Sequence, residues 1–247
     1  MTYLQFHLVF ILPPLFLVAL ASRGSLRRLG ARALPSLVGV VLIALVYTTP
    51  WDTELIRRGV WGYGPERVMG TIGLIPIEEY MFFVLQPLLA GLWFYRLVPP
   101  DLSDAAPPSA TMRWSGTAVY ALLALLGVWL LQRREGTYMG MILAWAAPVL
   151  AAQWALIAGR IAAAPRAFIL GIAVPTAYLW VADAIAIHLG IWHISKTQTL
   201  GVRFGSLPLE EATFFLATTL LCVQGLTLFL FPAKKAVTAA ARAGLAS

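Results

Sequence analysis

Long apolar runs separated by short polar stretches dominate the chain. A helix needs about 20 residues to cross the hydrocarbon core of a membrane. Seven runs come close to that length, at about 3–21, 34–50, 74–98, 114–131, 138–158, 167–189 and 207–231. A transmembrane β-barrel would instead show strands of about ten residues that alternate apolar and polar positions. The pattern therefore predicts an all-α membrane protein with seven transmembrane helices.

Composition agrees with this prediction. Of the 247 residues, 60% are hydrophobic and only 12% are charged, whereas soluble domains carry about 25% charged residues. The net charge of +7 comes mostly from short loops between the runs, where Lys and Arg set membrane topology. We therefore expect the protein to interact with membrane lipids and not with nucleic acid. The single cysteine, Cys222, lies inside an apolar run and is expected to pack there.

The positive charges also predict an orientation in the cytoplasmic membrane. The loops after the first, third and fifth runs and the C-terminal tail hold eleven Lys and Arg residues: Arg23, Arg27, Arg28, Arg32, Arg96, Arg113, Arg160, Arg166, Lys234, Lys235 and Arg242. The other side holds seven: Arg57, Arg58, Arg67, Arg133, Arg134, Lys196 and Arg203. By the positive-inside rule, the C-terminus is cytoplasmic and the N-terminus lies outside.

An internal repeat organises the chain. The stretches PIEEYMFF, residues 76–83, and PLEEATFF, residues 208–215, match, and Asp52 precedes Trp61 by nine residues as Asp183 precedes Trp192. One inserted residue aligns all these positions. We predict a first three-helix repeat at 1–98, a linker and connector helix at 99–137, a second repeat at 138–232 and a basic cytoplasmic tail at 233–247. The repeats enter the membrane from the same side, so both motifs should lie at one depth around an axis along the membrane normal.

The motifs supply the candidate acids and bases, Glu78, Glu79, Glu210 and Glu211. Pro followed by Glu also occurs at ordinary helix starts, but carboxylates inside a bilayer are costly and usually functional. Helical spacing sets each carboxyl one turn from an aromatic ring, the rings being Phe82, Phe83, Phe214 and Phe215. A protonated carboxyl group beside π faces is suited to protonating an apolar substrate and stabilising the resulting cation.

Two further acidic residues and two tryptophans recur in the repeats. Asp52 and Asp183 fall near helix C-termini, where an anion is disfavoured, so they need a partner such as Arg57, Arg203 or a motif glutamate. Trp61 and Trp192 either anchor the chain at the membrane interface or line a cavity. His188 is a possible proton relay, while His7 and His193 are expected to be structural.

Several cofactor signatures are missing from the sequence. There is no G-x-G-x-x-G that follows a strand, no aspartate-rich motif for magnesium diphosphate, and no Cys/His cluster for a metal. The seventh run has no lysine that could form a Schiff base. We therefore expect neither a cofactor nor a metal.

The duplicated motif resembles the flavin-free, integral-membrane lycopene β-cyclases. That family occurs as two three-helix subunits or as one fused chain with two repeats, and the resemblance covers about residues 1–232. It implies a cofactor-independent isomerase (an intramolecular lyase) that closes the ψ ends of lycopene, taken from the bilayer, to β-ionone rings in γ-carotene or β-carotene. It also implies Glu78 and Glu210 as leading acids, Glu79 and Glu211 as bases or proton-holding partners, and substrate contacts from the residues Trp61, Trp192, Phe82, Phe83, Phe214 and Phe215.

Two alternative functions fit the same residues. A related membrane branch hydrates carotenoid ends instead of closing them. A small proton-coupled transporter would also combine parallel repeats with membrane carboxylates, although the apolar runs contain few polar residues for an aqueous pathway. Which glutamate is acid or base, whether there are one or two active sites, how many rings form, and the oligomeric state are open at this point.

Overall fold

A computed structural model describes residues 1–232 and contains seven helical spans long and apolar enough to cross a membrane. The prediction of a seven-helix all-α membrane protein is confirmed. The predicted basic tail, with Lys234, Lys235 and Arg242, lies outside the described residues. The seven spans are Tyr3–Ala21, Arg23–Arg57, Ile77–Leu97, Ala110–Leu130, Arg134–Ala163, Pro165–His188 and Leu209–Leu230.

The first two spans are composite and the others are built around single helices. The first contains α1 (Tyr3–Phe6), a π-helical turn (His7–Ile11) and α2 (Leu12–Ala21), and the second contains α3 (Arg23–Leu29), a 3₁₀ turn (Gly30–Arg32) and α4 (Ala33–Arg57). The remaining helices are α5 (Ile77–Leu97), α6 (Ala110–Leu130), α7 (Thr137–Ala163), α8 (Pro165–His188) and α9 (Leu209–Leu230), with short 3₁₀ turns at Pro65–Arg67 and Arg134–Gly136.

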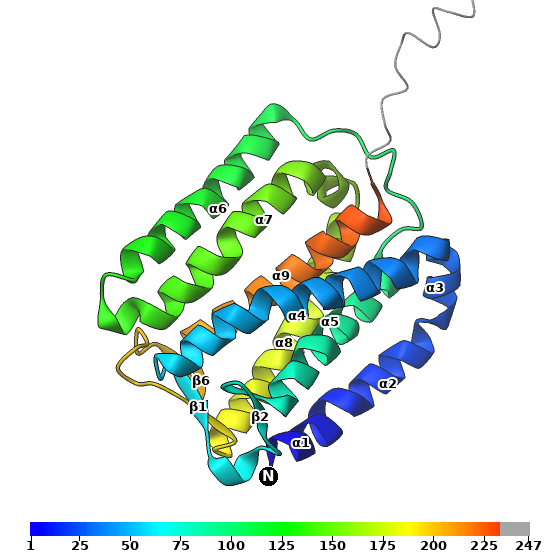
Figure 1. Cartoon of the computed structure of the whole chain (residues 1–247). Helices are drawn as coiled ribbons and strands as arrows, with labels where there is room; N and C mark the ends of the chain where they lie inside the picture. Colours follow the sequence, from blue (N-terminus) through cyan, green and yellow to red (C-terminus); the bar gives the residue numbers. More distant parts are fainter. Residues whose placement is uncertain (233–247) are drawn as a thin grey trace, which may run out of the picture.

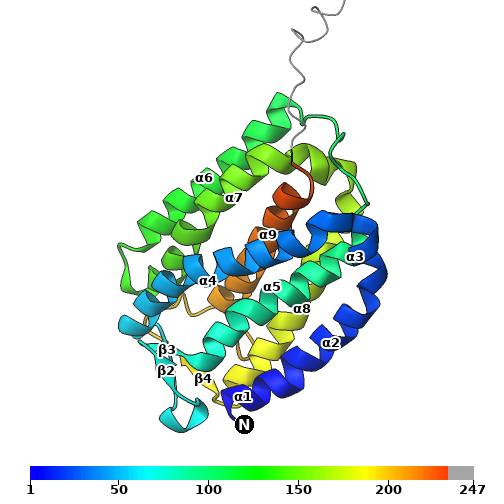
Figure 2. The same ribbon diagram turned by 45° about the vertical axis from the view of Figure 1, so that its right-hand side comes forward.

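The helices form one bundle in which α6 and α7 lie side by side at one flank and α2 lies at the other (Figures 1 and 2). Between them lie α4, α5, α8 and α9. The motif helices α5 and α9 begin at the end of the bundle that also holds the N-terminus and the strands (Figure 1). The two glutamate motifs are therefore at the same end of the molecule.

Three short antiparallel strand pairs cover that end. Strands β2 (Thr71–Ile72) and β3 (Ile75–Pro76) form a hairpin directly before α5, and β5 (Arg203–Phe204) and β6 (Leu207–Pro208) form its counterpart before α9. Each hairpin turns at a glycine with positive φ, Gly73 at 66° and Gly205 at 64°, a conformation that suits tight two-residue turns.

The third pair joins the two halves of the chain. Strand β1 (Trp61–Tyr63) pairs with β4 (Trp192–Ile194), and Gly62 lies opposite His193 at the centre. This β1–β4 ribbon carries both repeated tryptophans, with Trp61 opposite Ile194 and Trp192 opposite Tyr63.

The second span is longer than its apolar run at 34–50, because α4 continues to Arg57. Asp52 consequently lies inside the helix rather than at its end, and only 4% of its surface is exposed. The polar last turn is stabilised by ion pairs from Arg57 and Arg58 to Glu54. These arginines therefore do not pair with Asp52.

The residue inserted in the second half can be located in the structure. Backbone bonds run from Ile77 N to Gly70 O and from Leu209 N to Val202 O. The side chain of Glu78 accepts from Met69 N, and that of Glu210 accepts from Leu200 N. Between Leu200 and Val202 stands Gly201, with φ of 79°. The extra residue is absorbed in this loop, and the helix starts on either side keep equivalent bonds.

Candidate active site

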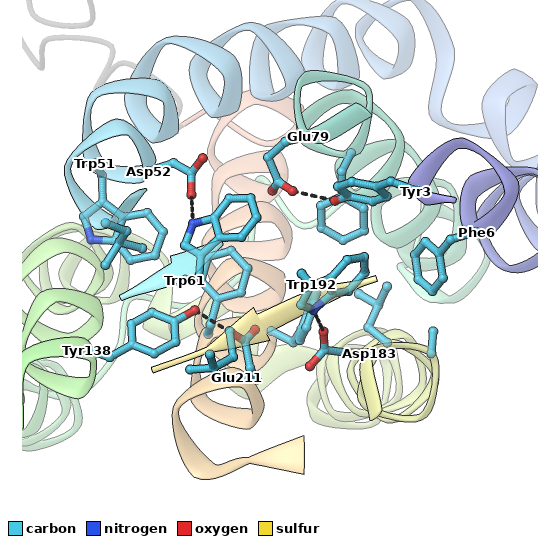
Figure 3. A pocket seen from close by; sticks show the side chains of 17 residues that line it. Tyr3, Phe6, Trp51, Asp52, Trp61, Glu79, Tyr138, Asp183, Trp192 and Glu211 are labelled. Carbon is cyan, nitrogen blue, oxygen red and sulfur yellow. Dashed lines mark hydrogen bonds between the residues drawn. The ribbon is translucent and has the colours of Figure 1, made fainter. Parts of the chain in front are cut away.

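Four of the six candidate carboxyl groups meet in one pocket. Asp52 comes from α4, Glu79 from α5, Asp183 from α8 and Glu211 from α9. The pocket lies under the β1–β4 ribbon between the two halves (Figure 3). We call it the acid pocket; it is lined by Tyr3, Phe6, Trp51, Asp52, Leu55, Trp61, Glu79, Phe82, Tyr138, Leu179, Ala182, Asp183, Trp192, Ile194, Glu211, Phe214 and Phe215.

Each glutamate of the acid pocket accepts a hydrogen bond from a tyrosine hydroxyl. Tyr3 Oη donates to Glu79 Oε2 over 2.5 Å, and Tyr138 Oη donates to Glu211 Oε1 over 2.7 Å (Figure 3). The two tyrosines lie near the start of the first helix of each half. The same pairing thus occurs twice across the pocket.

Each aspartate of the acid pocket accepts a hydrogen bond from a tryptophan indole. Trp61 Nε1 donates to Asp52 Oδ1 over 2.8 Å, and Trp192 Nε1 donates to Asp183 Oδ1 over 3.0 Å (Figure 3). These bonds supply the partner that an acidic residue at this depth requires. They also fix the orientation of both indole rings, which line the pocket.

The acid pocket is acidic and aromatic. Among the described residues that line it, none is Lys, Arg or His. Four ionised carboxylates without a cation would repel one another strongly in a buried, low-dielectric site. The cluster is therefore suited to keep protons bound and to exchange them between neighbouring groups.

The aromatic walls pack against one another. Trp192 lies 4.8 Å from Tyr3 and 5.1 Å from Phe6 between ring centroids, and Phe82 meets Phe215 edge to face at 6.0 Å. π faces attract cations, by about 0.5–2 kcal/mol each depending on desolvation. A carbocation formed in this pocket would be surrounded by such faces.

Glu78 and Glu210, the leading acids implied by the resemblance, do not line the acid pocket. Both are fully buried, and each has one oxygen that accepts a backbone N–H of the preceding loop: Met69 N at 2.8 Å for Glu78 and Leu200 N at 2.6 Å for Glu210. The first glutamate of each motif thus anchors the loop to the helix start, while the second reaches the pocket.

The remaining candidate residues divide between the pocket and other places. Phe82, Phe214, Phe215 and both repeated tryptophans line the pocket, whereas Phe83 does not. His188 is the last residue of α8 and also lies outside the lining. His7 is buried, and its Nε2 lies 2.8 Å from the backbone oxygen of Glu78.

Tyr3 and Tyr138 were missed as candidates in the sequence, although a signal for them exists. They lie 135 positions apart, and Pro13 and Pro148 have the same separation. If the sequence alignment of the two halves is extended into the first helix of each half, Tyr3 and Tyr138 fall at equivalent positions. This signal is weaker than that of the acidic and aromatic motifs, because isolated tyrosines near a membrane interface are common.

A family model described as lycopene cyclase matches residues 1–97 and 135–229, which are the two halves without the linker and α6. The chain belongs to the lycopene cyclase family. The resemblance noted in the duplicated motif is thereby confirmed, and the two matched segments each contribute two carboxyl groups to the acid pocket.

Individual relatives agree with this assignment. A lycopene beta-cyclase of Halobacterium salinarum is 42% identical over 231 residues, which cover 92% of this chain and 95% of that protein. A bifunctional lycopene cyclase/phytoene synthase of Colletotrichum graminicola is 41% identical over 202 residues, covering 77% of this chain and 34% of the fungal protein. That of Neurospora crassa is 38% identical over 202 residues. No solved structure matches the chain.

Proposed function

We propose that this protein is a lycopene β-cyclase that closes the acyclic ψ end groups of lycopene to β-ionone rings. The observation that carries the proposal is the acid pocket, in which four carboxyl groups from both halves are enclosed by aromatic rings. Membership of the lycopene cyclase family supports the choice of substrate. Lycopene is apolar, so it reaches the pocket from the bilayer.

The reaction needs one acid and one base. A proton adds to carbon 2 of the ψ end, and carbon 1 becomes cationic. The double bond between carbons 5 and 6 attacks carbon 1, which forms the bond from carbon 1 to carbon 6 and moves the charge to carbon 5. Loss of the proton on carbon 6 then creates the ring double bond. One proton is delivered and one is removed, and no electrons are gained or lost, so the reaction is an isomerisation.

We assign the acid–base exchange to Glu79 and Glu211. They lie at equivalent positions in the two halves, and both line the acid pocket. One donates the proton to carbon 2 and the other accepts the proton from carbon 6. The hydrogen bonds from Tyr3 and Tyr138 hold each carboxyl group in place through one oxygen, which leaves the other oxygen for the substrate. Positioned acid–base groups contribute about 10²–10⁴-fold to a rate.

Asp52 and Asp183 position the indole rings of Trp61 and Trp192 in the pocket. Their carboxyl groups accept the indole N–H bonds, which orients the electron-rich rings toward the place where positive charge develops. Phe82, Phe214 and Phe215 complete the aromatic wall.

Exclusion of water decides the product. Water that reached the cation at carbon 1 or carbon 5 would trap it as a tertiary alcohol. The β1–β4 ribbon covers the polar end of the pocket, and the backbone of Ser195 extends the ribbon with a bond to Val60 O over 2.8 Å. This cover favours proton loss, and therefore ring closure, over hydration.

Expression in a host that accumulates lycopene tests the proposal. Pigments are extracted and separated by chromatography, with an empty vector as the control. We expect γ-carotene or β-carotene to replace lycopene. Unchanged lycopene in cells that contain the protein in their membranes would contradict the proposal, and hydroxylated ends would instead favour the hydratase alternative.

A further inference from the structure

A second and larger cavity lies beside the acid pocket. Its volume is about 330 Å³, within the range of about 300–1,000 Å³ that ligand pockets usually have, whereas the acid pocket holds only about 50 Å³. We call it the side cavity. It lies between α4, α5, α7 and α9 and is lined by Val40, Ile43, Ala44, Tyr47, Thr48, Phe82, Phe83, Gln86, Pro87, Trp145, Val149, Gln153, Phe214, Thr218, Leu221, Cys222, Gly225, Leu228 and Phe229.

The side cavity and the acid pocket share part of their lining. Phe82 and Phe214 line both spaces, so these two rings form the partition between them. From Phe214 the side cavity follows α9 to Phe229, a distance of about 22 Å at 1.5 Å per residue. Its shape suits an extended chain rather than a single ring.

The outer end of the side cavity faces the surroundings of the bundle. Ile43 on α4 is 52% exposed, Tyr47 on α4 is 39% exposed and Phe229 on α9 is 45% exposed. In a membrane these positions contact lipid tails. The inner residues Phe83 and Cys222 are buried, so the cavity leads from the lipid into the bundle.

A row of stacked aromatic rings runs beside this path: Tyr47, Trp145 and Phe214 line the side cavity, and Trp51 lines the acid pocket. Tyr47 stacks on Trp145 at 5.3 Å and donates a hydrogen bond to its backbone oxygen over 2.9 Å. Trp145 stacks on Trp51 at 4.6 Å, and Trp51 stacks on Phe214 at 5.4 Å with an interplanar angle of 7°. The row thus connects the lipid-facing Tyr47 with the ring at the partition. A conjugated polyene can stack on such rings.

A buried amide gives a second sign of a ligand. Gln86 lines the side cavity, is 5% exposed, and its Nε2 has no hydrogen-bond partner among the described residues. An unpaired buried N–H group is costly. The π face of a polyene offers it a weak acceptor.

Three positions that line the side cavity have larger residues at the equivalent positions of the other half. Gly225 and Trp93 are equivalent positions, since they lie 132 residues apart like Glu79 and Glu211. The indole of Trp93 donates to Leu170 O over 3.0 Å and takes up room on that side. In α8, Leu179 stands where α4 has Thr48, and Pro175 stands where α4 has Ala44.

We propose that the side cavity is the channel that admits a linear polyene from the membrane and holds its chain while one end reacts in the acid pocket. This inference rests on the proposed function and adds where the chain lies and from which side it enters. Trp93, Leu179 and Pro175 are larger than Gly225, Thr48 and Ala44 at the equivalent positions, so the substrate is held in one orientation. Movement of Phe82 or Phe214 would open the partition and let the end group pass.

Substitution of Gly225 tests the channel. A Cβ at this position would lie 3.4 Å from Nε2 of Gln153 and 3.5 Å from Cγ2 of Val40, so Gly225→Ala fits with little change and serves as the matched control. Gly225→Trp gives this side the residue that Trp93 provides on the other and fills the cavity. Ala44→Phe narrows it from the opposite wall and is a second, independent variant.

Each variant is assayed with lycopene and with a shortened acyclic apocarotenoid that keeps one ψ end. We expect Gly225→Trp and Ala44→Phe to lower lycopene cyclisation at least tenfold and to leave cyclisation of the short substrate within threefold of the wild type. Gly225→Ala, which adds a single methyl group, should lower lycopene cyclisation much less than Gly225→Trp does. Turnover of the short substrate also shows that each variant is folded.

The outcomes separate the channel from the function. If the wild-type protein cyclises neither substrate, the proposed function fails. If the wild type cyclises lycopene and both Gly225→Trp and Ala44→Phe do so at the wild-type rate, the proposed channel is wrong and the proposed function stands. Equal loss with both substrates would also overturn the channel, provided that circular dichroism and thermal unfolding of the purified variants match the wild type.

Discussion

At the scale of residues, the two glutamates of each motif have different surroundings. Glu79 and Glu211 face the acid pocket and are held by tyrosine hydroxyls. Glu78 and Glu210 are held by backbone N–H groups of the loops that precede the helices. A glutamine keeps the acceptor oxygen of a glutamate and loses its ability to transfer a proton. The Gln variants therefore separate a chemical from a structural role.

We expect Glu79→Gln and Glu211→Gln each to lower turnover of lycopene by about 10²-fold or more, which is the usual scale for loss of an acid or base. Glu78→Gln and Glu210→Gln keep the bond to the loop and should stay within about fivefold of the wild type, a margin worth about 1 kcal/mol. Initial rates in lipid vesicles measure all four variants. Loss of turnover in Glu78→Gln and Glu210→Gln, together with normal turnover in Glu79→Gln and Glu211→Gln, would reverse the assignment of the acid and base.

The tryptophan–aspartate bonds give a second prediction at this scale. Trp61→Phe and Trp192→Phe keep an aromatic ring but remove the N–H donated to Asp52 or Asp183. Removal of the donor leaves a buried acceptor oxygen unpaired, which costs about 1–3 kcal/mol, so each variant should turn over lycopene about 10- to 100-fold more slowly. Trp114→Phe, at an exposed position on α6, is the control. A rate equal to the wild type in both pocket variants would show that the indole N–H groups do not matter.

Sequence patterns identified most of the pocket and left the division of roles undecided. The repeat indicated Asp52, Asp183, both tryptophans and the paired glutamates. Adjacent glutamates differ by about 100° around a helix, so the choice between them depends on the helix orientation, which packing sets. In the structure, the N–H groups of Met69 and Leu200 hold the first glutamate of each motif. These hydrogen bonds depend on the conformation of the preceding loops, which the motif does not encode.

At the scale of elements, the β1–β4 ribbon links the halves over the acid pocket. Gly62 lies opposite His193, and a Cβ at Gly62 would lie 3.0 Å from His193 Nε2 and 3.1 Å from Cε1. A larger side chain at this position must separate the strands or displace the histidine ring. In the proposed mechanism, the intact ribbon excludes water from the cation.

We therefore expect Gly62→Val to raise the share of hydroxylated end groups among the products at least several-fold and to lower total turnover. The physical reason is that separated strands admit water, which traps the cation before proton loss. Pigment chromatography measures the ratio. Gly24→Ala is the control, because no atom outside its own neighbourhood lies within 4 Å of the added Cβ. An unchanged product ratio in a folded Gly62→Val protein would exclude this role of the ribbon.

Elements differ in how well the pattern of apolar residues predicts them. The transmembrane helices follow from long apolar runs and were predicted. The strands have two or three residues each, too few for an alternating pattern, and their pairing depends on glycine turns and on contact between distant halves. The extension of α4 beyond residue 50 was also missed, because its last turns are polar and are stabilised by Glu54 and its arginines.

At the scale of the whole molecule, the orientation in the membrane remains a prediction from the positive charges. In a Cys222→Ala background, Thr197→Cys places a thiol in the exposed loop after β4, and Ala106→Cys places one in the exposed segment between α5 and α6. A membrane-impermeant maleimide added to intact cells should label Thr197→Cys alone. Ala106→Cys should react only after the membrane is permeabilised. The opposite pattern would place the acid pocket at the cytoplasmic face.

In the proposed mechanism, the whole bundle encloses a single acid–base reaction that exchanges protons with lycopene. Cyclisation by the purified protein in vesicles equilibrated with D₂O tests it most directly, with product mass as the readout. One deuteron adds to carbon 2 and one proton leaves carbon 6, so each ring formed should carry one deuterium and raise the mass of the carotenoid by about one unit relative to lycopene. Cyclic product without deuterium, or lycopene left unchanged by the folded protein, would contradict the account.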